Sequence, residues 1–178
     1  NATLWRTLKA SKLETNLPKL ETLADGSIFS SGDITKRDMF TLTFPIDPSQ
    51  LPLTALRLEV LPDERLPAGG PGRSYYEGRQ GDFFLSEMTA KVGEQPIKLT
   101  AASHSYGKIS IGSGSADAAN VLDGDGSTGW GTAQREGEAN QLVVNLSEPI
   151  TGSGDLTIEL LFERHFAASL GRFGFRRP

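Results

Sequence analysis

The residues with the clearest chemical potential stand in one short segment, DGDGSTGW, at positions 123–130. Asp123 and Asp125 supply carboxylates, Thr128 supplies a hydroxyl, and the glycines between them let backbone carbonyls turn toward a common point. Hard oxygen ligands of this kind are the ones that Ca²⁺ prefers. Asp and Gly also favour tight turns, so a calcium loop and a simple turn are both open. An EF-hand is not expected, because Gln134 stands where that loop carries its last glutamate.

Other reactive side chains do not form a recognisable catalytic motif. His104 and His165 lack the spacing of a zinc site, and no Gly-x-Ser-x-Gly elbow occurs. Adjacent Asp63 and Glu64 stand in an expected loop, where nothing would drive their pKa values apart as acid–base catalysis of hydrolysis requires. The absence of cysteine excludes thiolate chemistry. A Ser-His-Asp triad is assembled in three dimensions, so the spacing of these residues in the sequence does not exclude one. Because no catalytic motif is recognisable, we expect a protein that is not an enzyme.

The length and net charge of the chain limit its domain organisation and the partners that it could bind. A chain of 178 residues is long enough to bury one substantial core, and we expect residues 1–178 to form a single domain excised from a larger multi-domain protein. The net charge of -4 and the pI near 5.2 argue against a nucleic-acid partner, which requires a dense basic surface. No run of about 18 apolar residues occurs, so no membrane-spanning helix is predicted.

The dominant pattern along the chain is an alternation of apolar and polar residues, which indicates strands with one buried face. The segments with this pattern or with strand-like composition are 40–44, 56–60, 81–92, 96–103, 142–146, 156–162 and 170–176. The helix-like spacing of Leu13, Leu17 and Leu20 is interrupted by Pro18. About eight or nine short strands joined by Gly- and Pro-rich segments predict an all-β fold, an antiparallel β-sandwich or barrel.

One expected loop, residues 61–81, is long for a compact domain, and loops of this length tend to be functional or mobile. It carries Arg73, Tyr75 and Tyr76, whose planar side chains can stack on sugar rings. The same side chains could instead pin the loop to the sandwich. Both interpretations stay open.

The segment SADAANVLDGDGSTGW (115–130) resembles one that discoidin-like, galactose-binding-like β-sandwiches carry after their first strand. This resemblance implies a jelly roll in which Asp123, Asp125 and Thr128 bind a structural calcium and Trp130 packs inward beneath it. The upstream segment GDFFLSEMTAKV resembles the closing strand of those modules, which implies that Glu87 lies near the same calcium. Here the closing strand precedes the calcium segment, so the order resembles a circular permutation. Permutation is tolerated because domain termini often lie close together at the surface.

A resemblance that covers most of the chain connects it to a domain of large planctomycete proteins that also carry a cytochrome c domain. The segments that carry it are, in order, DGSIFSSG, LTALRLEVLPDERLPAGGPGR, GDFFLSE, DGDGSTGW and SLGRFGF. It implies a non-catalytic accessory module of a periplasmic or extracellular protein. The chain has no Cys-x-x-Cys-His motif, so any haem would lie elsewhere in such a polypeptide.

Two functions follow as expectations. The first is a carbohydrate-binding module that recognises a glycan through loops at one end of the sandwich, with calcium as a structural ion. Its candidate contact residues are Arg73, Tyr75, Tyr76, His104, Tyr106 and Arg135. The second is a structural or protein-interaction domain that packs against neighbouring domains of the parent chain and binds no small ligand.

Overall fold

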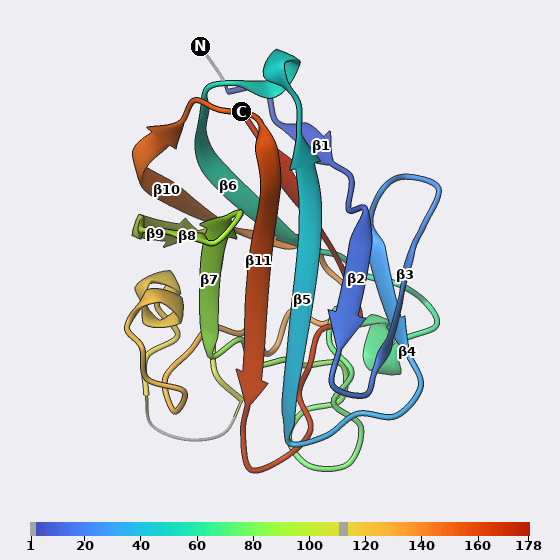
Figure 1. Cartoon of the computed structure of the whole chain (residues 1–178). Coiled ribbons are helices and arrows are strands. Elements are labelled where there is room, and N and C mark those ends of the chain that lie inside the picture. The colour runs from blue at the N-terminus through green and yellow to red at the C-terminus, as the bar shows by residue number, and fades with distance from the viewer. Residues whose placement is uncertain (1–2, 111–113) are drawn as a thin grey trace.

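The computed structural model of the chain describes residues 3–110 and 114–178, which form two antiparallel sheets packed face to face (Figure 1). In spatial order, the seven-stranded sheet comprises β3 (Lys19–Thr22), β4 (Ile28–Ser31), β12 (Arg172–Arg177), β6 (Leu53–Val60), β10 (Asn140–Ile150) and β9 (Leu99–His104), with β1 (Arg6–Leu8) also paired to β12. The five-stranded sheet comprises β2 (Lys12–Thr15), β5 (Arg37–Ile46), β11 (Gly154–Glu163), β7 (Glu87–Val92) and β8 (Gln95–Ile97). The helical elements of the described residues are the 3₁₀ turns η1 (Pro48–Gln50), η2 (Pro67–Gly69) and η3 (Ala118–Leu122). The predicted all-β antiparallel sandwich is confirmed, while its jelly-roll, galactose-binding-like connectivity stays a prediction.

The core lies between the two sheets and follows the alternation seen in the sequence. In β6, Leu58 is fully buried while its neighbours Arg57 and Glu59 lie on the outer face. The four apolar residues of β11 that alternate in the sequence are all buried in the same core. Burial of each large apolar side chain stabilises the fold by about 1.5–3 kcal/mol relative to exposure, so this alternation determines which face of each strand packs inward.

Aromatic side chains join the two sheets across the core. The ring of Phe40 in β5 lies 4.9 Å from that of Phe162 in β11 and 5.7 Å from that of Phe173 in the opposite sheet. A second pair, Phe44 and Phe175, meets edge to face at 5.6 Å. Such pairs add about 0.5–1.5 kcal/mol each beyond the area that they bury. They hold β12 over the centre of the five-stranded sheet.

The N-terminal strands β1 to β4 were not predicted. The sequence KLET occurs twice, and its two copies form β2 and β3, each at an edge of one sheet. Much of an edge strand is solvated, so its residues do not show the clear alternation of a central strand. Charged side chains on such edges oppose pairing with other chains. Leu13, Leu17 and Leu20 therefore belong to two strands and the turn between them.

Two predicted strands have different bounds in the structure. Regular pairing in the segment 81–92 begins at Glu87, and before it Leu85 forms an isolated bridge with Trp130. The segment 96–103 divides at Lys98, because β8 pairs within the five-stranded sheet and β9 within the seven-stranded one. The segment 61–81 contains η2 and an isolated bridge from Gly72 to Leu170, and no strand among these described residues, as expected.

No helix among the described residues is long and apolar enough to span a membrane.

Candidate calcium loop and ligand-binding surface

The loop after η3 is held by hydrogen bonds that its own backbone amides and side-chain hydroxyls donate to Asp123 and Asp125. Asp123 Oδ1 accepts the amide of Asp125 at 2.8 Å, and the hydroxyl of Thr128 donates to Asp123 Oδ2. Asp125 Oδ1 accepts the amide and the hydroxyl of Ser127 at 2.9 and 2.7 Å. Gly124 has a φ of 75°, which suits glycine. Asp123 and Thr128 therefore face each other, whereas the Asp125 carboxylate caps its own turn.

Glu87 reaches this loop from β7, as the resemblance implied. The backbones of Leu85 and Trp130 exchange two hydrogen bonds of 2.9 Å, which hold the chain entering β7 against the end of the loop. A Cβ on Gly129 would lie 2.3 Å from the carbonyl oxygen of Leu85, so this approach requires glycine. The Glu87 carboxyl is consequently close enough to the Asp123 carboxylate for the two groups to influence each other's pKa.

The electrostatics of this pair are those of two carboxyl groups that compete for one proton. Burial raises the pKa of Glu87 to about 7, and Asp123 adds to the rise, while the backbone amides of Gly124 and Asp125 oppose it. Burial also acts upward on the pKa of Asp123, but hydrogen bonds from Thr128 and Glu87 leave that pKa below its usual value. Glu87 Oε1 is buried and has no hydrogen-bond partner among residues 3–110 and 114–178. A cation between the two carboxylates would relieve their repulsion.

The four side chains predicted to bind calcium do not all converge on one point. Within the described ranges, no group of three or more Asp, Glu, His or Cys side chains is placed to hold a metal ion. The Asp125 carboxylate is directed to Ser127, so Glu87, Asp123 and the Thr128 hydroxyl are the predicted ligands that converge. Their oxygens match the donor chemistry that Ca²⁺ prefers, and further ligands would have to be backbone carbonyls or water.

Trp130 lies beneath the loop, as the resemblance implied. Its side chain is fully buried, its ring meets that of Phe83 edge to face at 5.3 Å, and its indole N–H donates to the carbonyl of Tyr106 at 3.0 Å. Buried indole groups usually find such a partner. Trp130 is therefore a core residue and not a ligand platform.

Tyr75 and Tyr76 are exposed, whereas Arg73 is bound to the sandwich by hydrogen bonds. The two tyrosines are 56% and 91% exposed, and their rings meet edge to face at 4.7 Å. A hollow of about 670 Å³, here called the tyrosine hollow, opens between them and the loop 32–36. Arg73 instead donates hydrogen bonds to Ser30 Oγ at 3.3 Å and to the carbonyl of Ser31 at 3.2 Å, which pins the loop 61–81 to β4.

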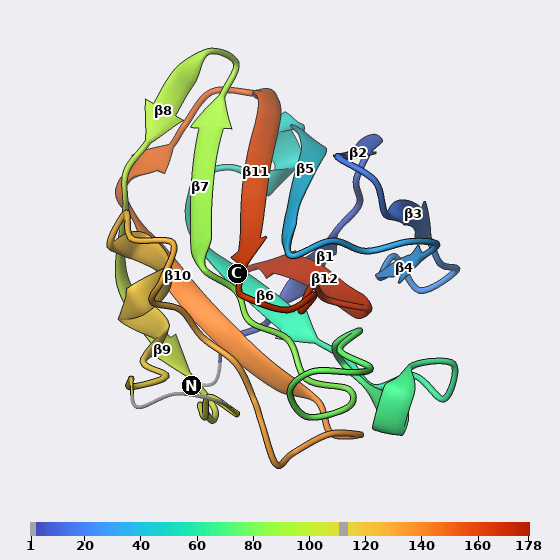
Figure 2. The ribbon, with the colours of Figure 1, turned by 90° about the horizontal axis from the view of Figure 1, so that it is seen from below.

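The other predicted contact residues lie apart from the tyrosine hollow. His104 is exposed at the end of β9, and Tyr106 follows shortly after it. The Tyr106 hydroxyl donates to the carbonyl of Ala133 at 2.8 Å, and the Arg135 guanidinium lies 4.2 Å from the Tyr106 ring centroid. Both side chains thus have partners in the surrounding loops. Figures 1 and 2 show η3 (gold) on the side of β7 and β9, and the loop 61–81 (green) toward β4.

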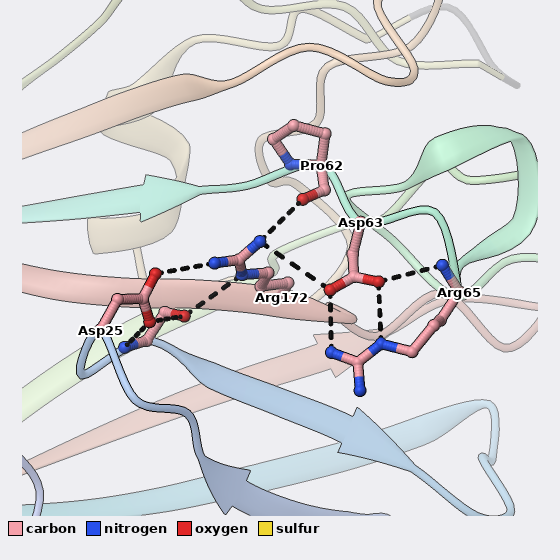
Figure 3. A network of polar contacts seen from close by, with 6 residues as sticks. Asp25, Pro62, Asp63, Arg65 and Arg172 are labelled. Carbon is pink, nitrogen blue, oxygen red and sulfur yellow. Dashed lines mark hydrogen bonds and ion pairs between the residues drawn. The ribbon is translucent and has the colours of Figure 1, made fainter.

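A polar network that the sequence did not indicate connects β12 to the loop 61–81 (Figure 3). Arg172 lies between Asp25 and Asp63, at 2.7 Å and 3.8 Å, and Arg65 binds both oxygens of Asp63 at 2.9 Å. Hydrogen bonds from Arg65, and beyond them the positive charge of Arg172, lower the pKa of Asp63 to about 2 although burial opposes this. Asp63 is therefore an ionised anchor, unlike a catalytic acid.

Asp82 carries a buried carboxyl group that the sequence did not indicate. Asp82 is 4% exposed, and burial raises its pKa to about 6, although the Ser110 hydroxyl and the amide of Phe83 lower it in part. Asp82 follows a glycine in a polar loop, so nothing in the residue types signals that this carboxyl group is enclosed.

No family model matches the chain, and neither a search of curated proteins nor one of solved structures finds a match.

Proposed function

We propose that the protein is a non-catalytic module that binds a glycan in the tyrosine hollow. One observation carries this proposal. The large apolar side chains that are exposed in the described residues are Leu4, Leu17, Tyr75 and Tyr76, and all but Leu4 line this hollow. Exposed apolar side chains that gather at one place mark interaction sites. A tyrosine ring offers a flat apolar surface to a sugar ring and a hydroxyl to its substituents.

The rim of the hollow supplies the polar groups that sugar hydroxyls require. Asp33 and Glu77 provide acceptors and Lys36 provides donors. The Thr35 hydroxyl also lines the hollow, but it already donates to Asp38 Oδ1 at 2.8 Å. The volume of about 670 Å³ falls within the range of about 300–1,000 Å³ that is usual for small-molecule sites. An apolar floor with convergent polar groups is the common composition of such sites.

A structural calcium at the loop after η3 belongs to the same proposal. Glu87, Asp123 and the Thr128 hydroxyl would hold the ion, which would supply the positive charge that two apposed carboxylates lack. The buried Glu87 Oε1, which has no partner within the described ranges, supports this assignment. The ion would hold the loop against the entry to β7, and recognition would take place at the tyrosine hollow on other loops.

The resemblance to planctomycete proteins supports the wider setting of the proposal. In that setting the chain is a periplasmic or extracellular accessory module, and neighbouring domains of a longer polypeptide are its further partners. If the intact parent protein binds glycan and loses this binding when the module is deleted, the result would support this setting.

An array of neutral and sulfated polysaccharides tests glycan binding. Binding to an immobilised polysaccharide should fall by about tenfold or more in Tyr75→Ala and Tyr76→Ala, which corresponds to about 1.4 kcal/mol. His104→Ala is the matched control, because it removes an exposed ring outside the hollow. A blank array would contradict the proposal and favour the alternative, a protein-interaction domain without a small ligand. Equal binding by all variants would place the site elsewhere.

A further inference from the structure

The tyrosine hollow is the first of three adjoining hollows. A second, of about 400 Å³, shares Gly32, Ile34 and Tyr75 with it and is called the central hollow. A third, of about 700 Å³, shares Arg65 with the central hollow and is called the arginine hollow, because Arg65 and Arg172 line it. The shared residues place the three in a row, with the central hollow in the middle.

A planar, exposed side chain stands at each boundary of this row. Tyr75 separates the tyrosine hollow from the central hollow and is 56% exposed. Arg65 separates the central hollow from the arginine hollow, and half of its side chain is exposed. The planar Arg65 guanidinium is held in place, because it lies 3.8 Å from the centroid of the Phe29 ring and binds Asp63 with two nitrogens. Preorganised planes of this kind lose little conformational entropy when a ring stacks on them.

The charges along the row balance. Its lining cations are Lys36, Arg65, Arg73 and Arg172. Its lining carboxylates are equal in number, namely Asp33, Asp63, Glu64 and Glu77. Arg65 and Arg172 are already bound to Asp63, and Arg73 donates to backbone carbonyls (Figure 3 shows the first two). A binding site for a polyanionic chain needs an excess of positive charge. The residues that line the three hollows do not supply this excess.

We infer that the ligand is an uncharged glycan chain that lies along all three hollows, with its rings against Tyr75 and Arg65, and not a single terminal sugar. This inference rests on the proposed function. Contacts are then spread over successive sugar units, so affinity depends on chain length. Binding of a terminal sugar alone would involve the tyrosine hollow and would be independent of Arg65.

Titration calorimetry with cello-, xylo-, manno- and galacto-oligosaccharides, from monosaccharide to hexasaccharide, tests the inference. The affinity for the ladder that binds should rise over several added units, by about tenfold or more in total, and then level off. Affinity that is constant beyond the disaccharide, or binding restricted to sulfated polymers, would overturn the inference and leave glycan binding intact. Failure of every oligosaccharide and of the polysaccharide array would overturn the proposed function itself.

Variants at the two ends of the row separate the hollows. Arg65→Ala should weaken hexasaccharide binding by about tenfold and leave disaccharide binding nearly unchanged, whereas Tyr76→Ala should weaken both. Arg65→Lys retains the charge next to Asp63 but lacks the planar guanidinium, so it should show the same loss if the plane is what matters. Arg79→Ala is the matched control. Arg79 is similarly exposed (54%) and pairs with Glu136 at 2.7 Å, but it does not line these hollows. Equal effects of Arg65→Ala and Arg79→Ala would contradict the inference.

Discussion

The carboxyl group of Glu87, the first residue of β7, lies beside the carboxylate of Asp123 in the loop after η3. The contact joins two segments that are far apart in the chain, and it depends on the Leu85–Trp130 bridge, which aligns them. Two carboxyl groups in contact repel each other once both are ionised. The pair therefore either shares a proton or binds a cation that neutralises both charges.

Calcium added to chelator-treated protein should raise the thermal midpoint, because an ion that binds the folded state alone stabilises it by mass action. At a concentration 100 times the Kd the gain is about 2.7 kcal/mol. Glu87→Gln should abolish most of this shift. Without calcium it should leave the stability nearly unchanged, since glutamine can still donate a hydrogen bond to Asp123. Differential scanning fluorimetry measures both quantities.

Asp155→Asn is the control for the calcium prediction, because Asp155 is an exposed carboxylate at the start of β11. Its calcium shift should equal that of the original protein. A shift that survives in Glu87→Gln, or none at millimolar calcium, would rule out an ion between Glu87 and Asp123.

Trp130→Ala should lower the free energy of unfolding by about 3–5 kcal/mol, because it leaves a cavity under the loop and removes the partner of the Tyr106 carbonyl. Denaturant unfolding followed by circular dichroism measures this loss. Tyr76→Ala truncates an aromatic residue that is 91% exposed, so it should change the stability by less than about 0.5 kcal/mol. Similar values for the two variants would show that Trp130 is not a core residue.

Arg172→Met should destabilise the fold by about 1–3 kcal/mol, because it removes the charge-assisted hydrogen bond to Asp25 and leaves Asp63 with Arg65 alone. Only a quarter of the Arg172 side chain is exposed, so added salt should reduce the effect little. Arg37→Met breaks an exposed pair with Glu163 and should cost less than about 0.5 kcal/mol. Urea unfolding at low and high salt compares the two variants. A loss at Arg172 no larger than that at Arg37 would contradict a role for this network in the fold.

Asp82 should make the stability depend on pH in the weakly acidic range. Its pKa is about 6 in the folded protein, above the ordinary 3.8, so the folded state retains the proton to a higher pH than the unfolded chain. The stability that Asp82 contributes is therefore complete below pH 3.8 and is lost as the pH rises through 6, a change on the order of 2–3 kcal/mol. Urea unfolding from pH 4 to pH 7 should show this fall in the original protein and a flatter profile in Asp82→Asn. Identical profiles would exclude a perturbed Asp82.

Residue types alone were enough to identify the central strands. In β6 and β11, each apolar residue that alternates with a polar one is buried, because a strand turns successive side chains to opposite faces. The edge strands β2 and β3 were not predicted. A strand at the edge of a sheet is largely solvated, so its sequence need not alternate apolar and polar residues. The division of segment 96–103 between two sheets was likewise not predictable, since a change of sheet at Lys98 alters partners and not composition.

The sequence by itself determined the local chemistry of this protein, namely a loop of carboxylates and glycines, a pair of tyrosines and strands with one apolar face. The tertiary structure decided which of these groups meet. It brings Glu87 to Asp123, turns the Asp125 carboxylate away to Ser127, buries Trp130, and lines up the hollows beside Tyr75. The physical reason is that pairing between distant strands and burial in a common core set these distances, and neither is encoded in the spacing of residues along one segment.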